Sequence, residues 1–184
     1  MTIAVLRWDR RQLGIGQITS GGYHACGLTP AGEAYCWGMN FEGQIGTGVM
    51  GSSVLVPTRV SDGGLRSTNI AAGESHTCAL TSAGTAYCWG GNGRGELGAD
   101  PAAVGFASAT PLAVPGGFTF ASLDAGEVHT CGVTSAGAGM CWGSREFGQV
   151  GDGVIGAALP PDLPWCQEDC SWPGLRPAAA RPAR

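Results

Sequence analysis

The residues best suited to metal binding or redox chemistry are one histidine and two cysteines that recur together three times. Each set begins with His-x-Cys, and its second cysteine lies ten residues after the first. The sets are His24, Cys26 and Cys36; His76, Cys78 and Cys88; and His129, Cys131 and Cys141. Two thiolates and an imidazole could hold a zinc ion with a fourth ligand from elsewhere. Two cysteines could instead form a disulfide, so the strands that position them decide the chemistry.

The two cysteines of each set lie on predicted strands joined by a tight turn. In the second repeat, residues 77–81 and 85–89 flank a three-residue loop that ends in Gly84, where a left-handed conformation is needed. Counting outward from this loop places Cys78 directly opposite Cys88, within disulfide reach. The predicted disulfides are therefore Cys26 with Cys36, Cys78 with Cys88, and Cys131 with Cys141, with no metal and no cofactor.

Strand alternation separates the other repeated side chains into two faces. Each histidine shares a face with its cysteines, and a tryptophan lies on the opposite face beside a small residue. We expect the histidines to hydrogen-bond backbone within their own sheet and the tryptophans to pack between neighbouring sheets. These structural positions are His24, His76 and His129, and Trp37, Trp89 and Trp142.

Composition limits the class of protein. The 184 residues include 33 glycines, 43 % hydrophobic residues and only 13 % charged ones, which is typical of a folded chain rich in turns. The net charge of -4, with no basic run before the last few residues, makes nucleic acid an unexpected partner. No apolar stretch is long enough to span a membrane. Eight cysteines favour an extracellular or cell-surface location, although the start of the chain has no signal-peptide core.

Three segments align without gaps: residues 18–38, 70–90 and 123–143. Their spacing of about 50 residues is the length of one propeller blade. The shared pattern Gly-x-x-His-(Thr/Ala)-Cys, followed by Cys-Trp-Gly and Gly-Gln-Ile-Gly, resembles the regulator-of-chromosome-condensation (RCC1) repeat in its cysteine-bearing bacterial form. The resemblance covers about residues 17–155. It implies an all-β fold, a partial β-propeller of about three four-stranded blades, where the family closes a ring of typically seven.

The chain is predicted to divide along these repeats. Residues 1–17 are a degenerate strand or a remnant of a preceding blade, 18–69 and 70–122 are repeats, 123–160 is an incomplete repeat, and 161–184 is a tail rich in Cys and Pro. In the tail, Cys166 and Cys170 are a possible further disulfide, and we expect its end to be disordered. We interpret the chain as a fragment of a longer propeller; a self-associating arc and a stable three-blade arc are the alternatives.

Function is predicted to reside in a surface and not in catalysis. The sequence has no nucleophile elbow and no phosphate-binding loop, so we expect no enzyme activity. Loop residues that differ between repeats are the candidate contacts with an unknown protein partner: Phe41, Glu42, Arg94, Glu146 and Phe147. We therefore expect a protein-binding scaffold. The alternatives are a guanine-nucleotide exchange factor for a small GTPase, which the resemblance suggests, and a zinc-binding module or hydrolase.

Overall fold

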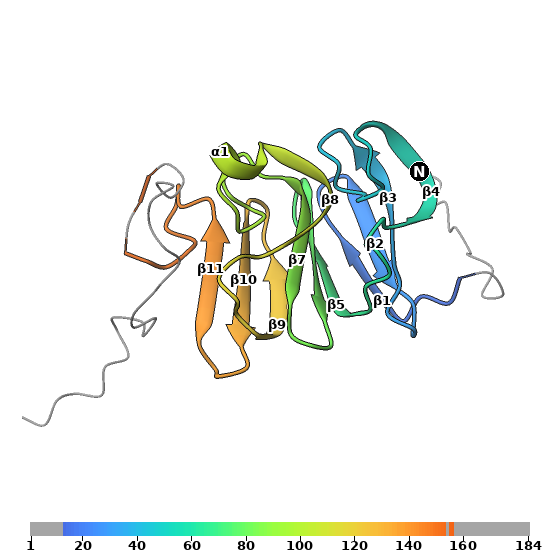
Figure 1. The fold of residues 1–184 in the computed structure, drawn as a ribbon. Helices are drawn as coiled ribbons and strands as arrows, with labels where there is room; N and C mark the ends of the chain where they lie inside the picture. Colours follow the sequence, from blue (N-terminus) through green and yellow to red (C-terminus); the bar gives the residue numbers. More distant parts are fainter. Residues whose placement is uncertain (1–12, 154, 157–184) are drawn as a thin grey trace, which may run out of the picture.

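Strands alternate with glycine-rich turns along the chain, and they fold into three antiparallel sheets that stand side by side (Figure 1). The computed structural model describes residues 13–153 and 155–156. The predictions for residues 1–12 and for the tail with Cys166 and Cys170 lie outside these described residues. Within them, the architecture is that of a partial β-propeller, as the repeats predict.

Each sheet is one blade, and its strands follow chain order from the inside of the arc to the outside. Blade 1 contains β1 (Gln17–Ser20), β2 (His24–Leu28), β3 (Ala34–Asn40) and β4 (Gly51–Arg59). Blade 2 contains β5 (Ser67–Ala72), β6 (His76–Thr81), β7 (Ala86–Gly91) and β8 (Ala107–Ala113). The described part of blade 3 contains β9 (Phe120–Ala125), β10 (His129–Thr134) and β11 (Gly139–Gly143). The first strands, β1, β5 and β9, contact one another in turn.

The registers of the central hairpins are those that the sequence predicts. Cys26 pairs with Cys36 between β2 and β3, and Cys78 with Cys88 between β6 and β7. The hairpin turn of blade 2 contains Gly84 at φ +78°, the left-handed region in which glycine has no steric penalty. Local sequence therefore determines the pairing within each blade.

The hydrophobic cores lie between the blades. We call the side of a blade that carries its disulfide the forward face and the side that carries its tryptophan the rear face. One core joins the forward face of blade 1 to the rear face of blade 2, and it includes Cys26, Leu28, Ile70 and Trp89. The second repeats this arrangement between blades 2 and 3. Each blade is thus stabilised by burial against its neighbour, as in other repeat proteins.

Among the described residues, a short helix forms where the sequence analysis predicted none. α1 (Pro101–Val104) lies in the connection between β7 and β8. The Asp100 side chain caps it by accepting a hydrogen bond from the backbone N–H of Ala102 at 2.9 Å, and Pro101 occupies its first turn. Asp followed by Pro is a typical helix start and could have indicated this turn.

Candidate functional site

Three disulfides cross-link the blade hairpins. They join Cys26 to Cys36, Cys78 to Cys88, and Cys131 to Cys141, the pairs that the hairpin register predicts, with Cα atoms 4.1 Å apart in each. A disulfide sulfur is not the thiolate that binds zinc. Within residues 13–153 and 155–156, no three His, Cys, Asp or Glu side chains are grouped as metal ligands would be.

A buried hydrogen-bond network joins blade 1 to blade 2. The ring Nε2 of His24 lies 2.8 Å from the hydroxyl of Thr77 in the next blade. That hydroxyl donates to the backbone carbonyl of Gln44 at 3.0 Å, and the indole N–H of Trp89 donates to the same carbonyl at 2.9 Å. Since the hydroxyl gives its single proton to the carbonyl, it accepts from His24, whose proton is therefore on Nε2.

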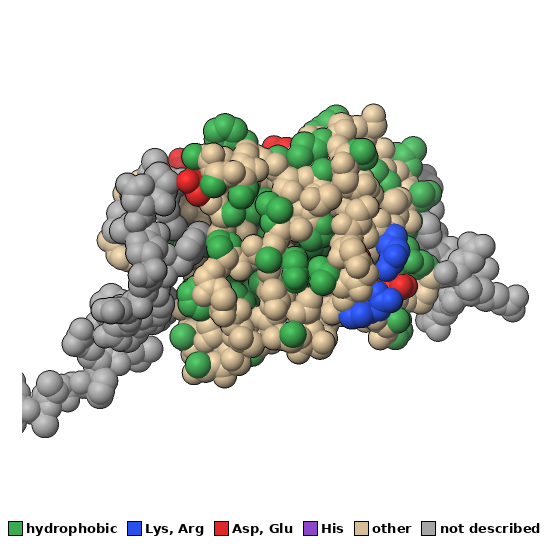
Figure 2. Space-filling view, in the orientation of Figure 1, with side chains coloured by type: hydrophobic (Ala, Val, Ile, Leu, Met, Phe, Trp, Pro, Cys, Tyr) green, Lys and Arg blue, Asp and Glu red, His purple; other side chains and the backbone are tan. Residues whose placement is uncertain are grey.

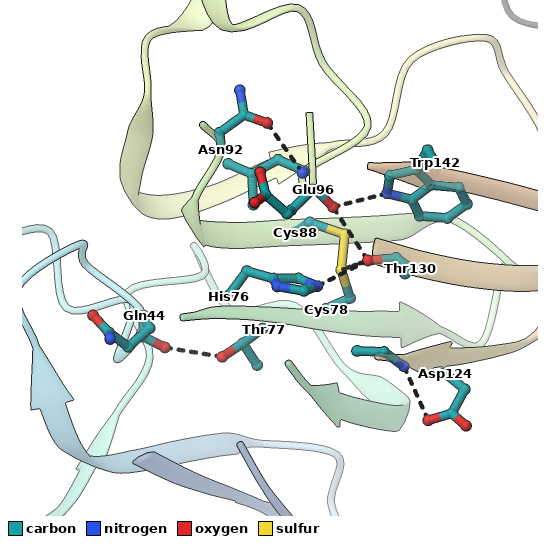
Figure 3. The surroundings of a disulfide bond; sticks show 12 residues. Gln44, His76, Thr77, Cys78, Cys88, Asn92, Glu96, Asp124, Thr130 and Trp142 are labelled. Atoms are coloured by element: carbon teal, nitrogen blue, oxygen red, sulfur yellow. Dashed lines mark hydrogen bonds between the residues drawn. A yellow bond between two sulfur atoms is a disulfide. The ribbon is translucent and has the colours of Figure 1, made fainter. Parts of the chain in front are cut away.

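The same network recurs between blades 2 and 3 (Figure 3). His76 Nε2 lies 2.9 Å from the hydroxyl of Thr130. Thr130 donates to the carbonyl of Glu96 at 3.2 Å, and Trp142 donates to that carbonyl at 2.9 Å. The histidines thus bond a side chain of the following blade, and the expectation of backbone contacts within their own blade was wrong for this nitrogen. We call this arrangement the blade-junction network.

Burial keeps the junction histidines neutral. Removal from water lowers the pKa of His24 to about 4, although the backbone carbonyl of Glu74 partly opposes this effect. Removal from water also lowers the pKa of His76 to about 4, with smaller contributions from the charges of His24 and His129. An uncharged imidazole at pH 7 suits the single-donor role that the network assigns to it.

The glycine-rich loops after β3, β7 and β11 are held by side chains that bond their own backbone. The Gln44 side chain accepts from the backbone N–H of Glu42 at 3.0 Å, and Glu96 accepts from that of Arg94 at 2.7 Å. In the third loop, Gln149 accepts from Phe147 at 2.8 Å. These three loops therefore have one repeated conformation. We call the surface that they form the loop face.

Glycine is required in one of these loops by close packing. Gly46 has φ +75°, and a Cβ atom there would lie 2.7 Å from the indole nitrogen of Trp89. A larger residue would displace the tryptophan from the blade junction. The glycine-rich element thus connects the loop face to the buried core.

The five predicted contact residues are exposed on these loops. Phe41 is 64 % exposed and Phe147 is 82 % exposed. The guanidinium of Arg94 lies 3.2 Å from the carboxylate of Glu146 and links the loops of blades 2 and 3. Glu42 lies against Gly91 of blade 2. Figure 2 shows acidic and hydrophobic side chains at this end of the molecule, beside α1.

One carboxylate is buried beneath the loop face. Glu96 is only 7 % exposed, whereas the equivalent position is glutamine in the other two repeats, Gln44 and Gln149. Burial raises the pKa of Glu96, and the nearby carboxylate of Glu42 adds to this effect. The backbone N–H and the charge of Arg94 partly oppose it. Burying a charge at this junction destabilises the fold at neutral pH.

Replacing Glu96 with glutamine should therefore raise the free energy of unfolding at pH 7.5 by about 1 kcal/mol. A folded-state pKa above the unfolded one means that the cost is present when the group is charged and disappears as the pH falls through that pKa. Urea denaturation at pH 7.5 and pH 5 should show the gain shrinking at the lower pH. Gln44→Glu is the matched control and should have the opposite sign; a Glu96→Gln gain independent of pH would contradict this explanation.

Comparisons with known proteins agree with these repeats. The family model described as the regulator of chromosome condensation (RCC1) repeat matches residues 31–80. A second model with the same description matches residues 16–44 and 68–96. The match over residues 31–80 contains the glycine-rich loop after β3. The matches over residues 16–44 and 68–96 contain the central hairpins of blades 1 and 2.

Similar proteins include both catalytic and receptor proteins. The chain is 33 % identical to human "Probable E3 ubiquitin-protein ligase HERC6" over 73 % of its own length and 14 % of that protein. It is 34 % identical to the Arabidopsis thaliana "Ultraviolet-B receptor UVR8" over 80 % of its length and 33 % of the receptor. The solved structure of Prp20p from Saccharomyces cerevisiae has a TM-score of 0.69 and 28 % identity, and the match covers 77 % of this chain and 36 % of Prp20p. The chain thus spans a third or less of these two curated relatives.

Proposed function

Because this chain belongs to the family of RCC1 repeat proteins, we propose that it is a non-enzymatic scaffold that binds a protein partner through its loop face. The observation that carries the proposal is the exposure of Phe41 and Phe147 on loops of fixed conformation. Loops held by a rigid sheet scaffold are common recognition sites, because little ordering is needed when the partner binds.

The composition of the loop face supports a protein partner. Large aromatic side chains and arginine are enriched among residues that dominate binding energy at protein interfaces. Arg94 is already oriented by Glu146, so its guanidinium loses less freedom on binding. In the loops after β3, β7 and β11, four carboxylates are at least partly exposed and accompany one exposed arginine: Glu42, Asp100, Glu146 and Asp152, with Arg94. A partner with basic groups around an apolar contact would fit this surface.

A catalytic role is not carried over from the relatives. The human relative is named a probable ligase, but this chain covers only 14 % of that protein. In the part of the chain that the structure describes, the cysteines that recur in the repeats form disulfides, and two of the three recurring histidines belong to the junction network. The disulfides also support our proposal that the protein works in an oxidising compartment, outside the cell or at its surface. No helix among the described residues is long and apolar enough to cross a membrane.

The second candidate function is regulation of a small GTPase as an exchange factor. The likeness to Prp20p favours it, since that structure was reported with its binding properties to Gsp1p and histones. A nucleotide-release assay with candidate GTPases decides between the two functions. If the chain accelerates nucleotide release and loop-face variants lose this effect, the protein is an exchange factor and the scaffold proposal is wrong.

Binding should depend on the loop face and not on exposed apolar residues elsewhere. The protein can be cross-linked to its partners in cells of its source organism and the recovered partners quantified. The double variant Phe41→Ala, Phe147→Ala should recover about tenfold less of each specific partner than wild type, or less still. Leu55→Ser is the matched control, because Leu55 is 87 % exposed on the outer strand β4. Partners recovered equally with wild type and with the double variant would exclude the loop face as the binding site.

A further inference from the structure

Two exposed arginines of blade 1 share one carboxylate. Arg59 ends β4, and Arg66 lies in the connection from β4 to β5. The Nη2 atom of each guanidinium lies 3.5 Å from the same oxygen, Oε1 of Glu33, in the hairpin turn between β2 and β3. Figure 2 shows basic side chains beside an acidic one on this part of the surface. We call Arg59, Arg66 and Glu33 the two-arginine site.

Positive charge exceeds negative charge within the two-arginine site. The other two arginines that the structure describes each face a carboxylate of their own, Arg94 with Glu146 and Arg145 with Asp152. At the two-arginine site one carboxylate faces two guanidiniums. The acidic residue nearest in the chain to Arg66, Asp62, accepts instead from the backbone N–H of Gly64 at 2.9 Å. One guanidinium charge of the site is therefore left without a balancing carboxylate.

Blade 2 forms the same backbone without these charges. The equivalents of Arg59, Arg66 and Glu33, given by strand pairing and by the turn hydrogen bonds, are Ala113, Thr119 and Thr85. The backbone bond that ties the turn to the next blade is 2.9 Å from Ser67 to Gly32 and 2.8 Å from Phe120 to Gly84. Ion pairs as exposed as those of Arg59 and Arg66 also contribute little to stability. The fold therefore does not account for the three charged residues of blade 1.

The two-arginine site is at positions that neighbouring blades leave accessible. Blade 2 lies between blades 1 and 3, and its equivalent residues Ala113 and Thr119 are nevertheless exposed. Packing of a blade on either side therefore does not cover these positions. The site is also distant from the loop face along the blade, because β4 begins after a loop of that face and ends at Arg59.

One of the two guanidiniums is already held in place. Nη1 of Arg66 donates to the carbonyls of Gly64 and Leu65, both at 3.2 Å, while its Nη2 faces Glu33. A side chain that is oriented beforehand loses less freedom when a ligand binds. Two guanidiniums that converge on one carboxylate oxygen also have the charge and the donors to accept a second carboxylate.

We propose that the two-arginine site binds a carboxylate side chain from an acidic peptide segment of a partner protein. The incoming carboxylate accepts from guanidinium N–H groups of Arg59 and Arg66 that do not face Glu33, and it balances the charge that Glu33 leaves unpaired. Nucleic acid fits this site less well, because it is bound by many basic groups together, and the chain has a net charge of -4. The contact is separate from the loop face and does not depend on the partner proposed for it.

Titration of the full chain with a hexaglutamate peptide tests the proposal, with hexaglutamine as the control peptide. At low ionic strength we expect binding in the millimolar range, with changes in backbone amide NMR shifts concentrated at residues 30–33 and 58–67. Arg59→Gln and Arg66→Gln should each weaken binding about threefold, and Glu33→Gln should strengthen it about threefold. Arg94→Gln is the matched control, since Arg94 is 48 % exposed and also ion-paired, and it should leave the affinity unchanged.

Moving the site to blade 2 tests whether these three residues are sufficient. The triple variant Thr85→Glu, Ala113→Arg, Thr119→Arg should show a second group of shift changes, at residues 82–85 and 112–120, with the same dependence on hexaglutamate concentration. The wild-type chain should show no changes there. A well-dispersed amide spectrum of each variant confirms that it is folded.

Four results would overturn the proposal. Wild-type affinity in the double variant Arg59→Gln, Arg66→Gln would place the contact elsewhere, and equal weakening by Arg94→Gln would assign it to overall charge. A folded triple variant without new shift changes would show that these residues do not form a recognition unit. Duplex DNA that binds more tightly than hexaglutamate, and is lost with the same double variant, would make nucleic acid the ligand.

Discussion

Replacing Trp89 with alanine should lower the free energy of unfolding by about 3 to 5 kcal/mol, the usual cost of removing a buried large aromatic side chain. Trp89 is 1 % exposed and packs in the core between blades 1 and 2. Its indole N–H also satisfies the carbonyl of Gln44. The change therefore opens a cavity at the junction and removes one of two donors to a buried acceptor.

Urea denaturation followed by far-ultraviolet circular dichroism measures this effect. Trp89→Phe keeps most of the apolar volume and removes the N–H donor, so we expect a smaller loss of about 1 to 2 kcal/mol. Phe147→Ala is the matched aromatic control, since Phe147 is 82 % exposed, and its effect should stay within about 0.5 kcal/mol. A similar loss for Trp89→Ala and Phe147→Ala would show that the blade junction contributes little to stability.

The features that the sequence predicted well are those that depend on neighbouring residues in the chain. A three-residue loop with glycine at its end determines the register of a hairpin, and that register places Cys78 opposite Cys88. Strand alternation then decides which side chains share a face. The blade architecture and the disulfide pairs follow from this local information repeated three times.

The blade-junction network could not be found in this way, because its members are far apart in the sequence. His24 and Thr77 are 53 residues apart and belong to different blades. Periodicity shows that a residue recurs but does not show which blade it contacts. The signal available was the residue before the first cysteine, which is threonine in two repeats and alanine in one. The sequence does not show that this threonine accepts a hydrogen bond from the histidine of the preceding blade, because that contact depends on how one blade packs on the next.

The loop residues show a similar division between local and tertiary information. Variation between repeats marked Arg94 and Glu146 as exposed loop positions, and both are exposed. Their ion pair joins two loops whose separation depends on how blades 2 and 3 pack. Burial at the equivalent loop position also depends on blade packing, since Gln44 and Glu96 are buried, whereas Gln149 in blade 3 is only partly buried.

Lowering the pH from 7 to about 4.5 should destabilise the protein by about 2 to 3 kcal/mol for each junction histidine. Burial lowers the pKa of His24 and of His76 from 6.5 to about 4. In the unfolded chain both imidazoles bind protons below pH 6.5, while in the folded chain they stay neutral until about pH 4. Stability is thus fully present above pH 6.5 and is lost as the pH falls toward 4.

Glu96 opposes this trend in part. Because burial raises its pKa, protonation of its carboxyl in the folded protein stabilises the fold as the pH falls. Two histidines act against one carboxyl, so we expect a net loss of stability below pH 6.5. Between pH 7 and pH 8.5 the two imidazoles should contribute no slope.

Urea titrations at half-unit pH intervals, with the disulfides intact, measure the expected slope. His76→Gln can still donate an N–H toward Thr130 but cannot gain a proton, so its stability should vary less between pH 7 and 4.5 than that of wild type. His24→Gln should reduce the slope in the same way, and the two changes together should remove most of it. A double variant with the wild-type slope would show that acid acts on other groups. A reduced slope would instead establish that the histidines joining one blade to the next make this propeller segment sensitive to acid.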